Sequence, residues 1–243
     1  SQREKHEVVG ALMARNVTLA TQLTHNPGIW NPHIAPIILR SMVDVMITFS
    51  WICLEPQDRA QKFIMHGLGQ EKLQVEHLKN LVSSHTNDPD SHSSVEARTA
   101  WIDSQKFTFL TKVDVGSWSG ESTRSMAQEA DCMKEYRNAY QEFSGPTHSR
   151  WNHVARHNMT HCENPLHQYH RVPVDPPFQI EPGYLLQAAL YVRKTFDRFD
   201  ELTDIDVEVD SGYDTMVSLI DELHSDQENE DPDAGSSPSE ASA

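Results

Sequence analysis

The chain has 243 residues and a formal net charge of −16, and its three cysteines are widely separated. That length is sufficient for one large domain with a substantial core. Three cysteines without a CxxC pair exclude a disulfide framework and a zinc ribbon, and they favour a reducing cytoplasm. Fifteen of the 36 acidic residues lie from residue 200 onward, where no Lys or Arg occurs. The preceding part is nearly neutral, so global charge does not exclude RNA or a nucleotide as a ligand.

Apolar residues recur at intervals of three and four along most of the chain, which predicts an all-α protein. The predicted helices cover residues 4–23, 36–54, 59–82, 95–113, 122–143, 147–162, 181–199 and 213–223. We expect a polar loop at 83–94 and a proline-rich segment without helix at 163–178. No strand is predicted, since the alternating residues 203–211 fit a loop equally well.

These elements predict one helical domain at residues 1–224, followed by a disordered acidic tail at 225–243. The tail has two interpretations. It either solvates the terminus or imitates nucleic acid and restrains activity, in which case its deletion would raise activity. The first residues lack the basic and apolar layout of a signal peptide, so we expect no secretion signal.

The most apolar run, residues 34–54, is interrupted by Arg40 and Asp44. These charges favour a core helix over a membrane span. Their spacing of four places both side chains on one helix face. Two interpretations stay open: a buried ion pair that fixes the helix register, or a contact to a ligand or partner, since burying charges is costly unless both are satisfied.

Residues 136–171 hold six of the fourteen histidines and four arginines, and we expect the active site there. Within this segment Tyr140, Ser144 and His148 are spaced by four, which would align phenol, hydroxyl and imidazole on a continuous helix. A glycine and a proline directly follow Ser144. Alternatively, therefore, the helix stops and Ser144 caps a new one.

His153, His157 and His161 also follow one another at intervals of four. On a helix running to residue 162 they would share one face. That face is either solvated or binds a metal, although the segment offers few carboxylates to complete a metal site.

Arg156 and His161 form the pattern of arginine, four intervening residues and histidine. Arginine holds a phosphate or stabilises developing charge, and histidine moves the proton of an attacking 2′-hydroxyl or of the leaving oxygen. This chemistry requires neither a metal nor a cofactor. In an ideal helix the two residues lie about 140° apart, so they would meet only across a dimer interface or through a local distortion.

A family resemblance runs through residues 34–173. Arg40 and Asp44, then Pro56 and Arg59, and finally the segments YRNAYQEFSGPTH and NPLHQYHR resemble uncharacterised bacterial helical proteins related to the HEPN superfamily. The resemblance implies a homodimeric helical bundle, with an HEPN-like core at about residues 34–200. It also implies metal-independent ribonuclease activity in toxin–antitoxin, abortive-infection or antiphage systems. The superfamily motif of arginine, four to six residues and histidine falls on Arg156, His157 and His161.

The leading prediction is a homodimeric, HEPN-like ribonuclease that acts on RNA or a nucleotide. We expect it to be the effector of a bacterial antiphage defence or toxin system and to have partner proteins there. We expect the protein in the cytoplasm, without membrane association. The candidate catalytic residues are Arg156, His161, His157, His148 and Ser144. The candidate substrate-binding residues are Arg40, Asp44, Tyr140, Arg137 and His153. Two alternatives stay open: a non-catalytic module that binds a nucleotide or protein, and a metal-dependent enzyme that uses the histidine face.

Overall fold

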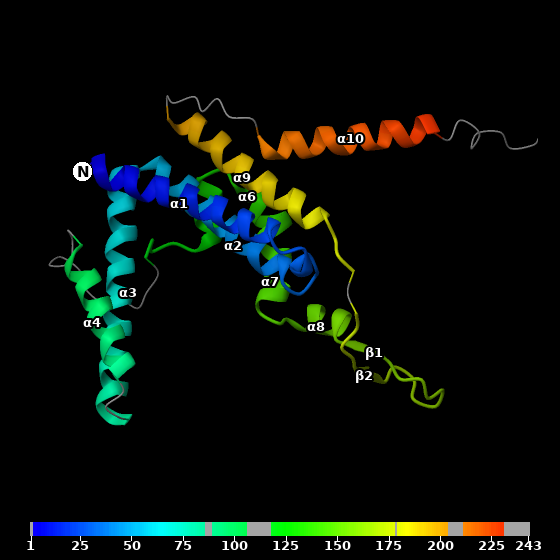
Figure 1. The fold of residues 1–243 in the computed structure, drawn as a ribbon, viewed down its shortest axis with the longest axis horizontal. Coiled ribbons are helices and arrows are strands. Elements are labelled where there is room, and N and C mark those ends of the chain that lie inside the picture. Colours follow the sequence, from blue (N-terminus) through cyan, green and yellow to red (C-terminus); the bar gives the residue numbers. More distant parts are fainter. Residues whose placement is uncertain (1, 86–88, 106–117, 178, 204–210, 231–243) are drawn as a thin grey trace, which may run out of the picture.

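The computed structural model describes residues 2–85, 89–105, 118–177, 179–203 and 211–230 (Figure 1). Within these ranges the chain is mostly helical, which confirms the all-α prediction. The α-helices are α1 (Gln2–Thr24), α2 (Ala35–Leu54), α3 (Pro56–His85), α4 (Pro89–Asp103), α5 (Thr123–Glu129), α6 (Met133–Glu135), α7 (Gln141–Thr147), α8 (Trp151–His157), α9 (Gly183–Leu202) and α10 (Gly212–Glu230). The remaining elements are the 3-10 helix η1 (Pro27–Ile29), the π-helix η3 (Tyr136–Tyr140) and the antiparallel strands β1 (Met159–His161) and β2 (Arg171–Pro173).

Helix α2 is the centre of the fold, because it packs against α1, α9, α7 and α5. Leu39, Val43 and Ile47 on this helix are completely buried. Burial of each such side chain contributes about 1.5–3 kcal/mol relative to exposure. By length and composition α2 could also cross a membrane, but 56% of its apolar window is buried inside the protein. It is therefore the core helix that the sequence predicts.

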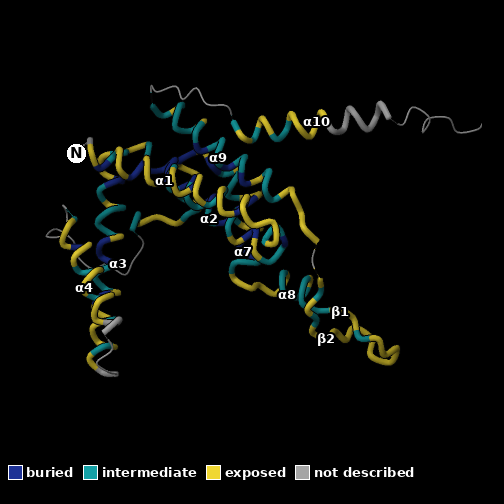
Figure 2. The backbone as a smooth tube through the Cα atoms, viewed as in Figure 1, coloured by how far each residue is buried: buried dark blue, intermediate teal, exposed yellow. Residues whose placement is uncertain are grey.

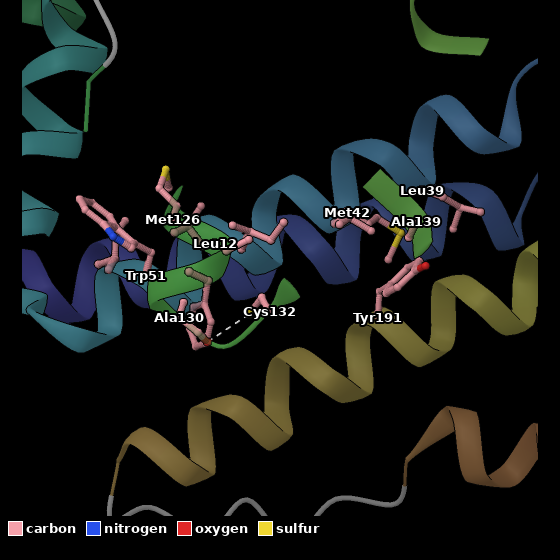
Figure 3. Packing of buried hydrophobic residues seen from close by; sticks show 14 of the residues in the cluster. Leu12, Leu39, Met42, Trp51, Met126, Ala130, Cys132, Ala139 and Tyr191 are labelled. Atoms are coloured by element: carbon pink, nitrogen blue, oxygen red, sulfur yellow. Dashed lines mark hydrogen bonds between the residues drawn. The ribbon is translucent and has the colours of Figure 1, made fainter. Parts of the chain in front are cut away.

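Side chains from distant parts of the sequence complete this core. Figure 3 shows Leu12 of α1, Met42 of α2, Met126 of α5 and Tyr191 of α9 among the buried residues of one cluster. In Figure 2 the buried positions gather where α1, α2 and α9 lie together, whereas α4 and the β-hairpin are mainly exposed. The hairpin therefore stands outside the main core.

A buried arginine joins α3 to the core. Arg59 is 5% exposed, donates a hydrogen bond from Nη1 to the Trp51 carbonyl at 2.7 Å, and stacks over the Trp51 ring at 3.8 Å. Glu129 of α5 accepts hydrogen bonds from both the Arg59 guanidinium and the Trp51 indole. These contacts lower the pKa of the Glu129 carboxyl. The trio ties α2, α3 and α5 together.

Helices α3 and α4 form a long hairpin that projects from the bundle (Figure 1). The predicted polar loop at 83–94 is wrong, because α3 continues to His85 and α4 begins at Pro89. Proline suits the first turn of a helix, where its missing N–H leaves no bond unmade. The predicted helix 95–113 ends earlier, at Asp103, and its residues 106–113 lie outside the described ranges.

Ser122 caps α5, because its hydroxyl accepts a hydrogen bond from the Ser125 N–H at 3.1 Å. The predicted continuous helix to residue 143 is nevertheless interrupted. Asp131 has a φ of 55°, a left-handed conformation that ends a helix. The chain then resumes through α6, the π-helix η3 and α7.

The C-terminal helices α9 and α10 are present as predicted, but α10 is longer than expected. It continues to Glu230, so the first part of the predicted disordered tail, residues 225–230, is helical. Residues 231–243 lie outside the described part of the chain, as do 204–210 of the segment that fits either strand or loop.

Candidate active site

The chain changes from helix to strand directly after His157. Asn158 leaves the helical conformation with a φ of −123°, and its carbonyl accepts a hydrogen bond from the Val174 N–H at 2.9 Å. The predicted helix 147–162 is therefore wrong beyond His157. His161 lies on β1, so His153, His157 and His161 do not share one helix face.

Strands β1 and β2 pair in a register that places His161 directly opposite Arg171. Side chains on a strand alternate between its two faces, so opposed residues point to the same side of the hairpin. Arg171 also donates a weak hydrogen bond from Nη1 to the Ala155 carbonyl in the last turn of α8, at 3.5 Å. The hairpin is thus joined to the end of the helix that carries Arg156.

Arg156, His161 and Arg171 line one open pocket with a volume of about 430 Å³. The other lining residues are Asn152, Ala155, Met159 and Thr160. The expected angular separation of Arg156 and His161 does not apply, because the two residues are on different elements. A single chain brings them together without a dimer interface.

The pocket has the charge required by an anionic ligand. Its lining contains two arginines and a histidine but no carboxylate. All three side chains are exposed, and no carboxylate of the described residues forms an ion pair with Arg156 or Arg171. Guanidinium groups bind phosphate in a bidentate manner, so this arrangement suits a phosphate or phosphodiester.

His153 and His157 belong to a separate cluster. Their ring centroids are 4.6 Å apart, and both rings contact His33, at 5.4 and 5.5 Å. Partial burial lowers the pKa of both imidazoles, and the neighbouring positive groups lower it further. The cluster therefore favours neutral histidines and lies beside the pocket rather than in it.

Arg40 is the centre of a third arrangement and is 7% exposed. Its Nε donates to the Ser144 hydroxyl at 3.1 Å, its Nη1 pairs with Asp44, and its guanidinium lies 3.1 Å from the centroid of the Tyr140 ring. Ser144 in turn donates to the Tyr140 carbonyl. Burial raises the pKa of the Asp44 carboxyl, and Arg40 offsets only part of that rise.

The helix passes through the glycine and proline after Ser144 and ends at Thr147, so Ser144 is not a helix cap. Within the described residues its hydroxyl bonds to Arg40 and to the backbone, and not to the His148 imidazole. His148 is exposed at the C-terminal end of α7, and Arg137 is exposed on the π-helix. These contacts of Arg40 with Ser144 and Tyr140 join α2 to α7 and η3.

Sequence reasoning missed Arg171 and His33. Strands β1 and β2, which carry His161 and Arg171, have three residues each. This is too short for the alternation of polar and apolar residues to be recognised in the sequence. His33 follows Asn31, whose side-chain oxygen accepts hydrogen bonds from the N–H groups of His33 and Ile34. This local turn before α2 positions His33, and its sequence contains no signal for contact with α8.

Comparison with known proteins identifies a family without a described activity. Residues 6–165 match the family of unknown function DUF5677. The matched region includes α8, β1, Arg156 and His161, and it ends before Arg171. No curated protein and no solved structure matches the chain.

Proposed function

The chain belongs to DUF5677, a family of unknown function, and we propose that it is a metal-independent ribonuclease that cleaves RNA in the pocket of Arg156, His161 and Arg171. The observation that supports this proposal best is the convergence of the arginine–histidine motif with a second arginine in one open pocket. The bare motif is common in sequences. Here Arg156 and His161 line one pocket together with Arg171, and this arrangement makes the motif chemically useful.

The reaction follows from the roles of these side chains. His161, as the neutral imidazole, accepts the proton of the 2′-hydroxyl while the 2′-oxygen forms a bond to phosphorus. The bond from phosphorus to the 5′-oxygen breaks, and that oxygen leaves with a proton returned by the imidazolium. Arg156 and Arg171 hold the phosphate oxygens and stabilise the charge that develops on them. The products are a 2′,3′-cyclic phosphate and a 5′-hydroxyl.

The biological setting is part of the same proposal. The resemblance to HEPN-superfamily proteins supports a cytoplasmic homodimer that acts as the effector of an antiphage defence or toxin system, with partner proteins that control it. The pocket itself is formed by one chain, so dimerisation is not needed to complete it. A dimer would instead extend the RNA-binding surface. The helical bundle is compatible with an HEPN-like fold.

The proposal is tested with single-stranded RNA incubated with the protein without added divalent cations. We expect cleavage to cyclic-phosphate products, and a decrease of about 10²–10⁴-fold in rate for His161→Ala and Arg156→Ala. Arg150→Ala is the matched control, because Arg150 is exposed at the start of the same helix and does not line the pocket. DNA of the same sequence should not be cleaved, since it lacks the attacking hydroxyl.

Other outcomes would support other functions. Binding of RNA or a nucleotide without turnover would indicate a recognition module, and the ligand would then raise the melting temperature. Cleavage that persists in both variants would exclude the proposed site. Cleavage that depends on added metal and on His153 and His157 would favour the metal-dependent alternative.

A further inference from the structure

The loop between β1 and β2 brings three potential metal ligands together. One donor atom from each of Cys162, His167 and His170 lies within 4.8 Å of the others. Cys162 Sγ is 3.6 Å from His167 Nδ1, and the two imidazole centroids are 5.3 Å apart. Within the described residues, this group differs from the cluster of His33, His153 and His157, because it contains a thiol and its three donor atoms converge.

The separation of sulfur and nitrogen fits tetrahedral zinc. A Zn–S bond of about 2.3 Å and a Zn–N bond of about 2.05 Å at a tetrahedral angle place the two ligand atoms about 3.6 Å apart. Cys162 Sγ and His167 Nδ1 already lie at that distance. Zn²⁺ would therefore fit between them with little movement of either side chain.

The backbone holds this loop in a closed shape. The Cys162 N–H donates to the His170 carbonyl at 2.9 Å, and the His170 N–H donates to the His167 carbonyl at 3.2 Å. Asn164 lies against the ring of His167, with Nδ2 3.3 Å from Nε2, which leaves the Nδ1 edge directed at the thiol. Tyr169 has a φ of 61°, in the left-handed region that tight turns use.

No apolar core explains why the loop closes. Every residue from 163 to 171 is exposed, and the two largest apolar side chains, Leu166 and Tyr169, are 87% and 93% exposed. A short segment that buries so little needs another source of stability, which a structural metal commonly supplies. The ligand geometry and the absence of burial point to the same conclusion.

We propose that Cys162, His167 and His170 bind one zinc ion, which stabilises the β1–β2 hairpin. Thiolate and imidazole are ligands that zinc prefers, and Cys162 releases its proton on binding. A water molecule would complete the tetrahedron. The sequence alternative placed a metal on His153, His157 and His161, which is a different set of residues.

The position of this zinc site gives it a role in the proposed ribonuclease. Cys162 directly follows His161, and His170 directly precedes Arg171, so two of the ligands are adjacent to two residues of the pocket. Zinc would keep the strands in register and so hold His161 opposite Arg171. This consequence rests on the proposed function, whereas zinc binding itself does not.

The test uses the full chain without a histidine tag, expressed with zinc in the medium and purified without chelators. Elemental analysis should find about one zinc per chain in the wild type and less than about a tenth of that in Cys162→Ser, His167→Ala and His170→Ala. His25→Ala and Cys53→Ser are the controls, because both residues lie far along the chain from the loop, and they should retain zinc. Circular dichroism should show unchanged helix content in the loop variants, whose side chains lie outside the core.

Cobalt(II) supplies a second measurement on the same proteins. Replacement of zinc should give the visible absorption of tetrahedral thiolate-bound cobalt, and Cys162→Ser should abolish it. A wild-type protein with less than about a tenth of a zinc per chain and no cobalt spectrum would overturn the site. A chain that binds zinc but cleaves no RNA would leave the site intact and remove the nuclease. Full cleavage by a wild-type protein that lacks zinc would remove the zinc site and leave the nuclease intact.

Discussion

His161 and Arg171 lie opposite each other in the β1–β2 pair, although ten positions separate them in the sequence. Opposed residues in an antiparallel pair have Cβ atoms about 4.5–5.5 Å apart, so both side chains project from the same face of the hairpin. Arg156 reaches this face from the last turn of α8. The pocket therefore depends on the register of two strands with three residues each, and a slip of one position would move His161 to the opposite face.

This relationship predicts a role for Arg171 in RNA binding. We expect Arg171→Ala to raise KM for RNA and also to lower kcat, because the side chain holds the phosphate in the bound substrate and stabilises the charge that develops on it during the reaction. The dependence of log affinity on log salt should become shallower by about 0.7, the value for one contact to single-stranded RNA. Binding measured at several salt concentrations checks this.

Arg171→Lys and Arg150→Ala are the comparisons for that experiment. The lysine should recover part of the salt dependence but not the bidentate contact, so affinity returns only partly. An unchanged salt slope in Arg171→Ala would show that Arg171 does not contact the phosphate.

Most of the helical fold is predictable from the sequence, and the reasons for the exceptions are local. The α1, α2 and α9 ranges follow from apolar spacing, because these helices bury one face in the core. The extension of α3 to His85 and the start of α4 at Pro89 have no such signal. The nearby residues 81, 83 and 92–94 are exposed, so polar residues that resemble a loop are compatible with helix there.

The site was only partly predictable for a related reason. The motif of Arg156 and His161 is visible in the sequence, but its geometry depends on the end of α8 at His157, which a propensity pattern does not locate. Arg171 becomes part of the site through strand pairing alone. By contrast, Arg40 and Asp44 form the ion pair that one of the two interpretations of their spacing predicts. The contacts of Arg40 to Tyr140 and Ser144 depend on tertiary packing and have no signal in the sequence.

Ser144 should matter for stability rather than for chemistry. In Ser144→Ala the buried Nε of Arg40 loses its acceptor, and leaving a buried donor unpaired costs about 1–3 kcal/mol. Asp44→Asn should cost less than about 1 kcal/mol, because the carboxylate is partly exposed. Urea unfolding measures both effects.

Ser41→Ala is the control for this prediction, since Ser41 lies beside Arg40 on α2 and its hydroxyl donates to the backbone carbonyl of Ile37 in its own helix. Its stability should change by less than about 0.5 kcal/mol. A nucleophilic Ser144 would give the opposite result: Ser144→Ala would abolish cleavage and leave the unfolding curve unchanged.

Glu129 should make the protein sensitive to acid. Hydrogen bonds from Arg59 and Trp51 lower the pKa of its carboxyl in the folded state, so the unfolded state binds more protons near pH 4. The stabilisation is present above the unfolded pKa and is lost as pH falls through the folded pKa. Glu129→Gln should therefore lower the melting temperature at pH 7, and the difference from wild type should shrink as pH decreases below about 4.3.

Glu76→Gln is the control for the acid sensitivity, because Glu76 is an exposed carboxylate on α3. This variant should leave the pH dependence unchanged. Equal melting temperatures for Glu129→Gln and wild type at pH 7 would show that the contacts to Arg59 and Trp51 add no stability.

The histidine cluster should add a second pH dependence near neutrality. Partial burial lowers the pKa values of His153 and His157, and His33 and Arg156 lower both further. His157 also lowers the pKa of His153, whereas Glu181 partly opposes the effect at His157. Because the unfolded histidines bind protons first, stability is present above their unfolded pKa of about 6.5 and decreases as pH falls below it. His153→Gln and His157→Gln should each flatten the melting-temperature profile between about pH 5 and 7.

His25→Gln is the control, because His25 is an exposed histidine that directly follows α1, and this variant should keep the wild-type slope. A slope that is equally steep in all three variants would place the titrating groups elsewhere.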